Sequence, residues 1–321
     1  MSLSTLLQIK KKTRRMSASP SPNQLSEADL EEYINTFYEE DFPSALKVWN
    51  LHDKLEFFTQ PNEDRYAFDT DRYYSVTPPV YVDGYNCSYS QSREELFRSY
   101  PKLITDQTGP TGNGSNGPYT FTLSAVPVLK RDVTLSMVDT AGSNQSASDV
   151  PDAVNNSIGT WIDNATGLAL VGSINYVTGA CSITWGSSIG ATENIAIKSS
   201  PYSASRPSIV LFFKNYFLMR PVPDKVYKVS VEVYSKPTQL LTSNTVSPDV
   251  NQWWQYIAIG AAIKVLQDRQ DIESIQNLMP FFKEQEALIM YRTATQQAPE
   301  RTATIFTSNN TSNGGFYGGN Y

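Results

Sequence analysis

Apolar residues recur every three or four positions in several parts of the chain, which is the spacing of a helix with one buried face. The clearest example begins at Ser26, where Ser26 and Asp29 form a capping-box pattern. A helix predicted to begin near Asp271 should bend near Pro280. It follows closely after the helix predicted for residues 250–269, so we expect these two helices to form an antiparallel hairpin. The predicted helices cover residues 26–37, 92–97, 250–269 and 271–295.

Short runs of β-branched and aromatic residues, separated by turn residues, predict strands elsewhere. Residues 108–118 are so rich in Gly, Pro and Asn that we expect a loop or linker there. Residues 176–185 should form a hairpin about Thr178-Gly179, and residues 220–224 should be the turn of another hairpin. The predicted strands are 54–59, 79–84, 119–123, 132–138, 168–176, 180–185, 193–198, 208–219 and 225–234.

This order of elements predicts an α+β fold, with a helical hairpin, an amino-terminal helix and a β-sheet, plus an inserted all-β sandwich-like domain. A Pro-rich stretch follows the basic amino-terminal segment, and a Gly- and Asn-rich stretch ends the chain, so we expect both ends to be flexible. The predicted domains are a basic flexible arm (1–25), a discontinuous α+β core (26–101 and 206–298), an inserted β domain (102–205) and an extended tail (299–321).

Composition narrows the possible functions. The 321 residues carry a net charge of −6, which argues against a protein whose whole surface grips nucleic acid. With one histidine and two cysteines, a zinc site built from several His and Cys ligands is excluded. The apolar patch at the amino terminus precedes its basic residues, the reverse of a secretory signal, so we expect the protein to be made in a cytosol.

Candidate catalytic or metal-binding groups are few. His52 could be a general base or a boundary histidine making local hydrogen bonds. The acidic residues Glu63, Asp64, Asp69 and Asp71 could attract a hard cation but lack the EF-hand pattern, so a solvated acidic loop is the other interpretation. The Gly-rich residues 109–117 lack the Gly-Lys-Ser/Thr ending of a phosphate loop. We therefore expect no catalytic residue, no cofactor and no metal.

Two groups of residues are candidates for contact with a partner. The first is basic and could bind phosphate or an acidic protein surface, unless it is only a solvated terminus. The second is aromatic and could anchor the tail in a neighbouring subunit, unless it is only a frayed end. These candidates are Lys10, Lys11, Lys12, Arg14 and Arg15 in the first group and Phe316, Tyr317 and Tyr321 in the second.

Four features resemble the adaptor, or head–tail connector, proteins of tailed bacteriophages. Residues 25–37 with Asp41-Phe42-Pro43 look like their amino-terminal helix, and residues 92–101 look like a segment found in such phage proteins. A Trp-rich helix with Trp253 and Trp254 follows a β region and is paired with a second long helix, after which a flexible tail extends. Residues 172–179 are similar to a β-hairpin motif of accessory domains in phage structural proteins.

The resemblance implies a structural virion protein and not an enzyme. Copies of such adaptors, commonly twelve, form a ring that joins the portal of the head to the tail nozzle or next tail component. Double-stranded DNA passes through the ring without tight binding, and no membrane takes part. The expected location is the head–tail junction of the virion, with assembly in the host cytoplasm. An acidic protein with sparse charge suits a DNA channel, because repeated phosphate contacts would retard the DNA.

Two other interpretations remain open. The inserted β domain could belong to a carbohydrate- or receptor-binding tail protein, with Trp161, Tyr176 and Trp185 as aromatic platforms for a sugar. The same rings could instead fill the core of the β domain. A third interpretation is an enzyme acting on cell-wall polymers, which no residue pattern in the sequence supports.

Overall fold

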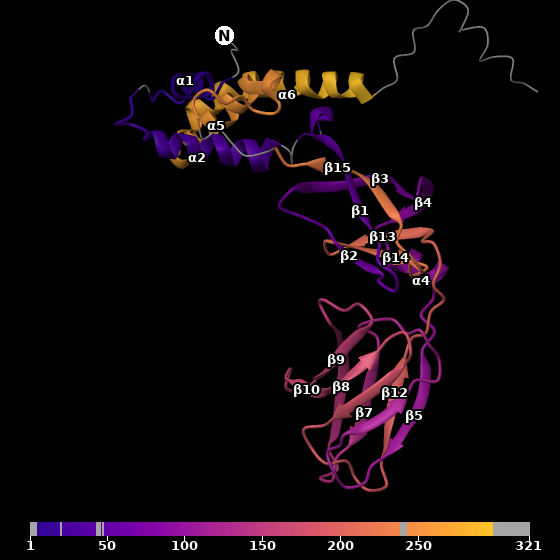
Figure 1. Cartoon of the computed structure of the whole chain (residues 1–321). Coiled ribbons are helices and arrows are strands. Elements are labelled where there is room, and N and C mark those ends of the chain that lie inside the picture. The colour runs from indigo at the N-terminus through magenta and orange to yellow at the C-terminus, as the bar shows by residue number, and fades with distance from the viewer. Residues whose placement is uncertain (1–4, 20, 43–45, 47, 238–242, 298–321) are drawn as a thin grey trace, which may run out of the picture. The chain divides into compact units, whose positions relative to one another are not determined.

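The protein is a mixed α+β molecule, as the sequence predicts. The computed structural model describes residues 5–19, 21–42, 46, 48–237 and 243–297 (Figure 1). The chain divides into two compact units, one formed by residues 1–53 and 234–321 and the other by residues 54–233. We call them the helical unit and the β unit.

The helical unit contains four α-helices within the described residues, together with short 3-10 and π-helical turns. The capping pattern at Ser26 is confirmed, because the Ser26 side chain accepts a hydrogen bond from the Asp29 amide at 3.1 Å. The elements are α1 (Leu6–Met16), α2 (Glu27–Thr36), η1 (Phe37–Asp41), η2 (Trp49–Leu51), η3 (Asn251–Trp253), α5 (Trp254–Asp268) and α6 (Ile272–Gln297).

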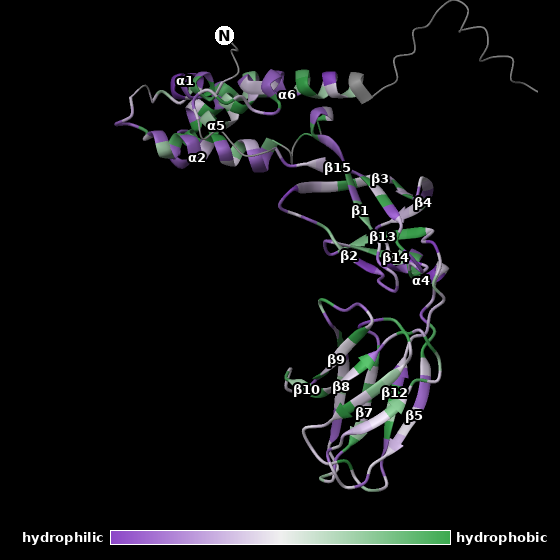
Figure 2. Cartoon of the chain, in the orientation of Figure 1, coloured by the Kyte–Doolittle hydropathy of each residue, from purple (hydrophilic) through white to green (hydrophobic). Residues whose placement is uncertain are grey.

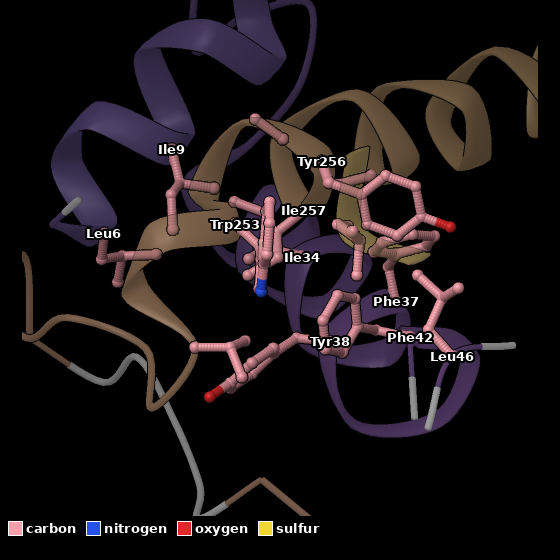
Figure 3. Packing of buried hydrophobic residues seen from close by; sticks show 14 of the residues in the cluster. Leu6, Ile9, Ile34, Phe37, Tyr38, Phe42, Leu46, Trp253, Tyr256 and Ile257 are labelled. Atoms are coloured by element: carbon pink, nitrogen blue, oxygen red, sulfur yellow. The ribbon is translucent and has the colours of Figure 1, made fainter. Parts of the chain in front are cut away.

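The core of the helical unit gathers around α5. Figure 1 shows α5 between α1 and α2, and Figure 3 shows the side chains that meet there. Tyr256 packs against the rings of Phe37 and Phe42, with centroid distances of 5.5 and 5.7 Å. On its other side α5 packs against α6 through Ile263 and Leu278. The nearly continuous apolar sequence of α5 is explained by this burial on several sides.

The prediction of a flexible arm at residues 1–25 is wrong for the described part of that segment. Residues 6–16 form helix α1, and Leu6 and Ile9 are fully buried. The Thr13 hydroxyl donates to the Ala258 carbonyl of α5 at 3.2 Å. A few apolar residues are enough to hold α1 against the helical unit, because the polar residues on its inward face form hydrogen bonds and ion pairs there.

The first sheet of the β unit has seven strands in the order β1-β15-β3-β4-β13-β14-β2. The helix α4 (Arg93–Ser99) packs on it by placing Leu96 against Ile209, Leu211 and Leu218. The strands are β1 (His52–Phe58), β2 (Arg65–Ala67), β3 (Tyr73–Val82), β4 (Tyr85–Ser90), β13 (Ile209–Phe213), β14 (Tyr216–Arg220) and β15 (Lys228–Ser235).

The predicted hairpin about residues 220–224 is wrong. Residues 208–219 form a hairpin by themselves, because β13 pairs antiparallel with β14 and the chain turns at Lys214-Asn215. Both turn residues have positive φ, at 48° and 61°, as in a type I′ turn. Strand β14 has β13 and β2 as its neighbours, so it is not paired with β15.

The second sheet has eight strands in the order β5-β12-β7-β8-β9-β10-β11-β6. The predicted hairpin about Thr178-Gly179 is confirmed, since β10 and β11 pair antiparallel with Ile174 opposite Cys181. Three strands of this sheet, β5, β8 and β9, were not predicted. The strands are β5 (Thr105–Thr111), β6 (Tyr119–Thr122), β7 (Thr134–Val138), β8 (Asn144–Pro151), β9 (Ile158–Asp163), β10 (Ala169–Asn175), β11 (Ala180–Thr184) and β12 (Asn194–Ser199).

The Gly-rich segment is only partly a loop. Its first residues belong to β5, where Thr108 lies opposite Ala196 of β12. Close packing explains the glycine at position 109, because a Cβ atom there would lie 2.9 Å from Cδ1 of Ile197. The linker prediction is therefore wrong up to Thr111, and the glycine content reflects close packing in that part.

The compact units have different bounds from the predicted domains. All strands of the eight-stranded sheet fall between residues 105 and 199, within the 102–205 range expected for an inserted domain. The seven-stranded sheet, however, groups with that sheet in the β unit and not with the helices. The discontinuous core of residues 26–101 and 206–298 is thus divided between two units.

Candidate subunit-contact surfaces

Lys10, one of the basic residues predicted to contact a partner, is occupied inside the helical unit. Its side chain is only 7% exposed. The ammonium group binds the Glu31 carboxylate, lies 3.3 Å from Glu27 Oε2 and donates to Asn244 Oδ1 at 3.0 Å. A lysine with these partners stabilises the unit and is not available to another protein.

Two further basic residues are also held internally. Arg14 lies 2.8 Å from the Glu27 carboxylate. Lys12 donates to Gln255 Oε1 at 2.8 Å and lies 5.3 Å from the centroid of the Trp254 ring. Burial, and secondarily the charge of Arg15, lower the pKa of Lys12. Lys10, Arg14 and Lys12 are therefore engaged within the helical unit, and their contact with a partner stays a prediction.

Lys11 and Arg15 form what remains of the basic surface. They lie four residues apart on α1, so they share one helix face, and both are exposed. Neither has an ion-pair partner among the described residues. We call these two residues the basic face.

The helical unit also has an acidic surface, which the sequence analysis did not identify. From Glu27 to Asp41 the chain carries seven acidic residues and no basic one. Four of them, Glu27, Asp29, Glu32 and Glu40, are exposed. Glu27 is paired with Lys10 and Arg14, and we call the other three the acidic face. The signal was readable in the sequence, as an acidic run directly after the basic segment.

A groove of about 260 Å³ lies beside the acidic face, between α2 and α5. The Tyr33 hydroxyl donates to the Asp268 carboxylate within it, and this hydrogen bond raises the pKa of Tyr33 to about 12. The groove is lined by Asp29, Glu32, Tyr33, Thr36, Lys264, Gln267 and Asp268. Its one lysine leaves the wall predominantly acidic.

Helix α6 presents an apolar stripe to solvent. Phe281, Leu288 and Tyr291 recur at spacings of seven and three residues and are 56%, 47% and 73% exposed. Leu278 and Ile289, in contrast, are buried in the helical unit. Figure 2 shows hydrophobic and hydrophilic segments alternating along the ribbon of α6. We call Phe281, Leu288 and Tyr291 the α6 stripe.

The predicted tail anchors Phe316, Tyr317 and Tyr321 lie outside the described residues. Their contact with a neighbouring subunit therefore stays a prediction.

Most of the residues considered for chemistry are engaged in internal contacts. The His52 ring stacks on Trp49 at 4.9 Å and meets the edge of Tyr234 at 5.4 Å. In the acidic loop, Asp64 binds Arg220 at 2.5 Å and Glu63 binds Lys130 at 2.7 Å. The described residues contain no group of three or more His, Cys, Asp or Glu side chains placed to hold a metal ion.

The aromatic residues proposed as sugar platforms are core residues. Trp161, Tyr176 and Trp185 are buried among the apolar side chains of the eight-stranded sheet. The Trp161 indole donates to the Ser182 carbonyl at 2.8 Å, which fixes the ring inside the fold. These three rings are not available to a carbohydrate, so this sheet has no platform built from them.

No protein-family model and no curated protein matches this chain. Within the described residues, no helix is both long and apolar enough to cross a membrane.

Proposed function

We propose that this protein is a structural virion protein, an adaptor whose copies form a ring joining the portal of a phage head to the tail. In this proposal α5 and α6 are the helical hairpin of the adaptor, and the eight-stranded sheet is an inserted, sandwich-like accessory domain. The ring lets DNA pass and carries out no catalysis. The resembling segments support the proposal by their positions, because residues 25–37 include α2 and residues 92–101 include α4.

The observation that carries the proposal is the separation of charge in the helical unit. Helix α1 has five basic residues and no acidic one, and the stretch Glu27–Asp41 has seven acidic residues and no basic one. After the internal pairs are formed, a basic face and an acidic face remain exposed. Two different complementary surfaces on one chain favour a head-to-tail contact between copies, and such contacts close into a ring when the rotation permits.

The low charge density also supports a channel for DNA. Lysine and arginine number 26 among 321 residues, against 32 acidic residues. A channel wall with few unpaired cations makes few phosphate contacts, so passing DNA is not held.

Charge reversal tests the head-to-tail contact. Lys11→Glu with Arg15→Glu reverses the basic face, and Glu32→Lys with Glu40→Lys reverses the acidic face. Each pair of substitutions should abolish ring assembly on the portal protein, because like charges then meet at every contact. A chain carrying all four substitutions should assemble again. Native mass spectrometry and sedimentation velocity of the protein, alone and mixed with portal, measure the assembly.

Arg98→Glu provides a matched control, since Arg98 is an exposed cation of the β unit. It should assemble like the unaltered protein. A protein that stays monomeric and does not bind portal would overturn the proposed function. Assembly that is unaffected by either pair of substitutions alone would exclude the charged faces as its contact surface.

A further inference from the structure

The face of the seven-stranded sheet that α4 covers continues beyond this helix as a surface of cations and aromatic rings. Residues directly opposite each other on paired strands share a face of the sheet. Leu218 of β14 lies opposite Leu211 of β13 and opposite Arg65 of β2. Leu211 and Leu218 pack against Leu96 of α4, which lies beside β13 and β14 (Figure 1). Arg65 therefore belongs to the same face as α4.

Three cations on this face lie against two neighbouring rings. Cζ of Arg65 is 4.3 Å from the centroid of the Tyr216 ring. Cζ of Arg93, on α4, is 5.3 Å from the Phe213 centroid, and Nζ of Lys214 is 5.8 Å from the same centroid. The centroids of Phe213 and Tyr216 are 6.2 Å apart. These five residues form one continuous surface, which we call the cation–aromatic patch.

The cations of the patch are available to a ligand. Arg65, Arg93 and Lys214 are exposed, and none of them has an ion-pair partner among the described residues. Stacking on a ring uses the flat face of a guanidinium group and leaves its N–H donors free at the edge. The ring also restricts a long side chain, so less conformational entropy is lost when the cation binds an anion.

The patch is suited to phosphate groups on a stiff support. An arginine binds phosphate through two N–H donors, and a lysine binds it as a point charge. A DNA duplex carries its phosphates on a stiff backbone, so separate cations bind it without the cost of ordering a flexible acidic peptide. The rings already carry the cations and are not free to stack on unpaired bases, which favours a duplex over a single strand.

We propose that the cation–aromatic patch binds the phosphodiester backbone of double-stranded DNA without reading its sequence, with one phosphate at each of the three cations. Three such contacts give an association constant that falls with about the 2.7th power of the salt concentration. The contact is therefore weak at physiological salt and does not retain a moving duplex. It goes beyond the connector function, and its test does not depend on ring assembly.

Fluorescence anisotropy of the full chain with a labelled duplex of about 20 base pairs tests the proposal. The association constant should fall about 40-fold as the salt rises from about 10 to about 40 mM. Each single substitution should lower the slope of log K against log salt by about 0.9 and weaken binding about tenfold or more at the lowest salt. The triple variant should not bind. The substitutions are Arg65→Gln, Arg93→Gln and Lys214→Gln.

Arg98→Gln is the matched control, because Arg98 is an exposed cation of the same helix, about 140° around it from Arg93. It should bind the duplex within about twofold of the unaltered protein. Far-UV circular dichroism and urea denaturation of every variant show that the fold is retained. Poly-glutamate with the same number of charges should compete at least about tenfold less well than unlabelled duplex.

Four outcomes would overturn the proposal. A protein that does not bind the duplex at the lowest salt lacks the site. An equal loss of affinity in Arg98→Gln and in the patch variants would mean that the attraction is diffuse. A triple variant with an unchanged salt slope would place the DNA contact elsewhere on the chain. Poly-glutamate that competes as well as the duplex would assign the patch to an acidic protein surface.

Discussion

The hydroxyl of Tyr176 donates to Oδ2 of Asp149 at 2.8 Å in the interior of the eight-stranded sheet. The same carboxylate accepts the Val133 amide at 2.8 Å and the Arg131 amide at 2.6 Å. Asp149 is itself buried. One carboxylate therefore joins strand β8, the turn after β10 and the segment leading into β7.

We predict that Asp149→Ala destabilises the β unit by about 3 kcal/mol or more, because it leaves three buried donors without an acceptor. Tyr176→Phe removes one hydrogen bond and should cost about 1 kcal/mol. Urea denaturation of both variants measures the free energies of unfolding. Equal losses for the two variants would contradict the role of Asp149 as the shared acceptor.

The pH dependence of stability follows from the same carboxyl. Burial raises the pKa of Asp149, and the hydrogen bonds from Val133 and Tyr176 only partly oppose it. A carboxyl with a raised folded-state pKa contributes stability that is fully present below its unfolded pKa of about 3.9 and is lost as the pH rises through the folded value. The stability of the natural protein relative to Asp149→Asn should therefore fall between pH 3 and 7. A relative stability that rises over this range would show that the hydrogen bonds outweigh the burial.

Gly260, in the middle of α5, marks a close helix contact. A Cβ atom at this position would overlap the Phe37 ring. Alanine is the better helix former by about 1 kcal/mol, yet we predict that Gly260→Ala destabilises the helical unit by about 2 kcal/mol through overpacking. Gly186→Ala, where a Cβ meets nothing within 4 Å, should be close to neutral. Calorimetric melting distinguishes the two, and adding Phe37→Leu should recover part of the loss.

Lys10 and Lys11 are neighbours in sequence with opposite expected behaviour. Lys10→Met removes the contacts to Glu31, Glu27 and Asn244 and should cost about 1–2 kcal/mol, limited because Glu31 and Glu27 are partly exposed. Lys11→Met should stay within about 0.5 kcal/mol of the natural protein. Guanidinium denaturation of the two variants gives the comparison. Similar small effects for both would mean that the contacts of Lys10 contribute little to the stability of the helical unit.

The elements with a strong local pattern were predictable from the sequence. The cap at Ser26, the helix before Arg269 and the β10–β11 hairpin each combine a clear period with a suitable terminus or turn. The strands β8 and β9 were missed because their sequences are polar, with Ser, Asp, Asn and Thr at many positions. Their place in the sheet comes from pairing with β7 and β10, which a local pattern does not contain.

The candidate surfaces were predictable only in part. The basic residues of α1 were identified, but the choice between Lys10 and Lys11 depends on which one faces Glu31 of α2, a contact between segments 21 residues apart. Predicting the α6 stripe requires knowing which apolar face of this long helix stays exposed when the neighbouring helices pack against it. The sequence of α6 contains both faces and does not distinguish them.

In chain order, β5 is the first strand of the eight-stranded sheet and β12 is the last. The two strands are paired, and Thr105, where β5 begins, lies opposite Ser199, where β12 ends. The chain thus enters and leaves this sheet at adjacent points, and residues 105–199 do not have to thread through the residues on either side of them. A stretch with this geometry can be gained, lost or exchanged as a cassette in one genetic event. Related chains can then differ by a whole module there while keeping the same framework on either side.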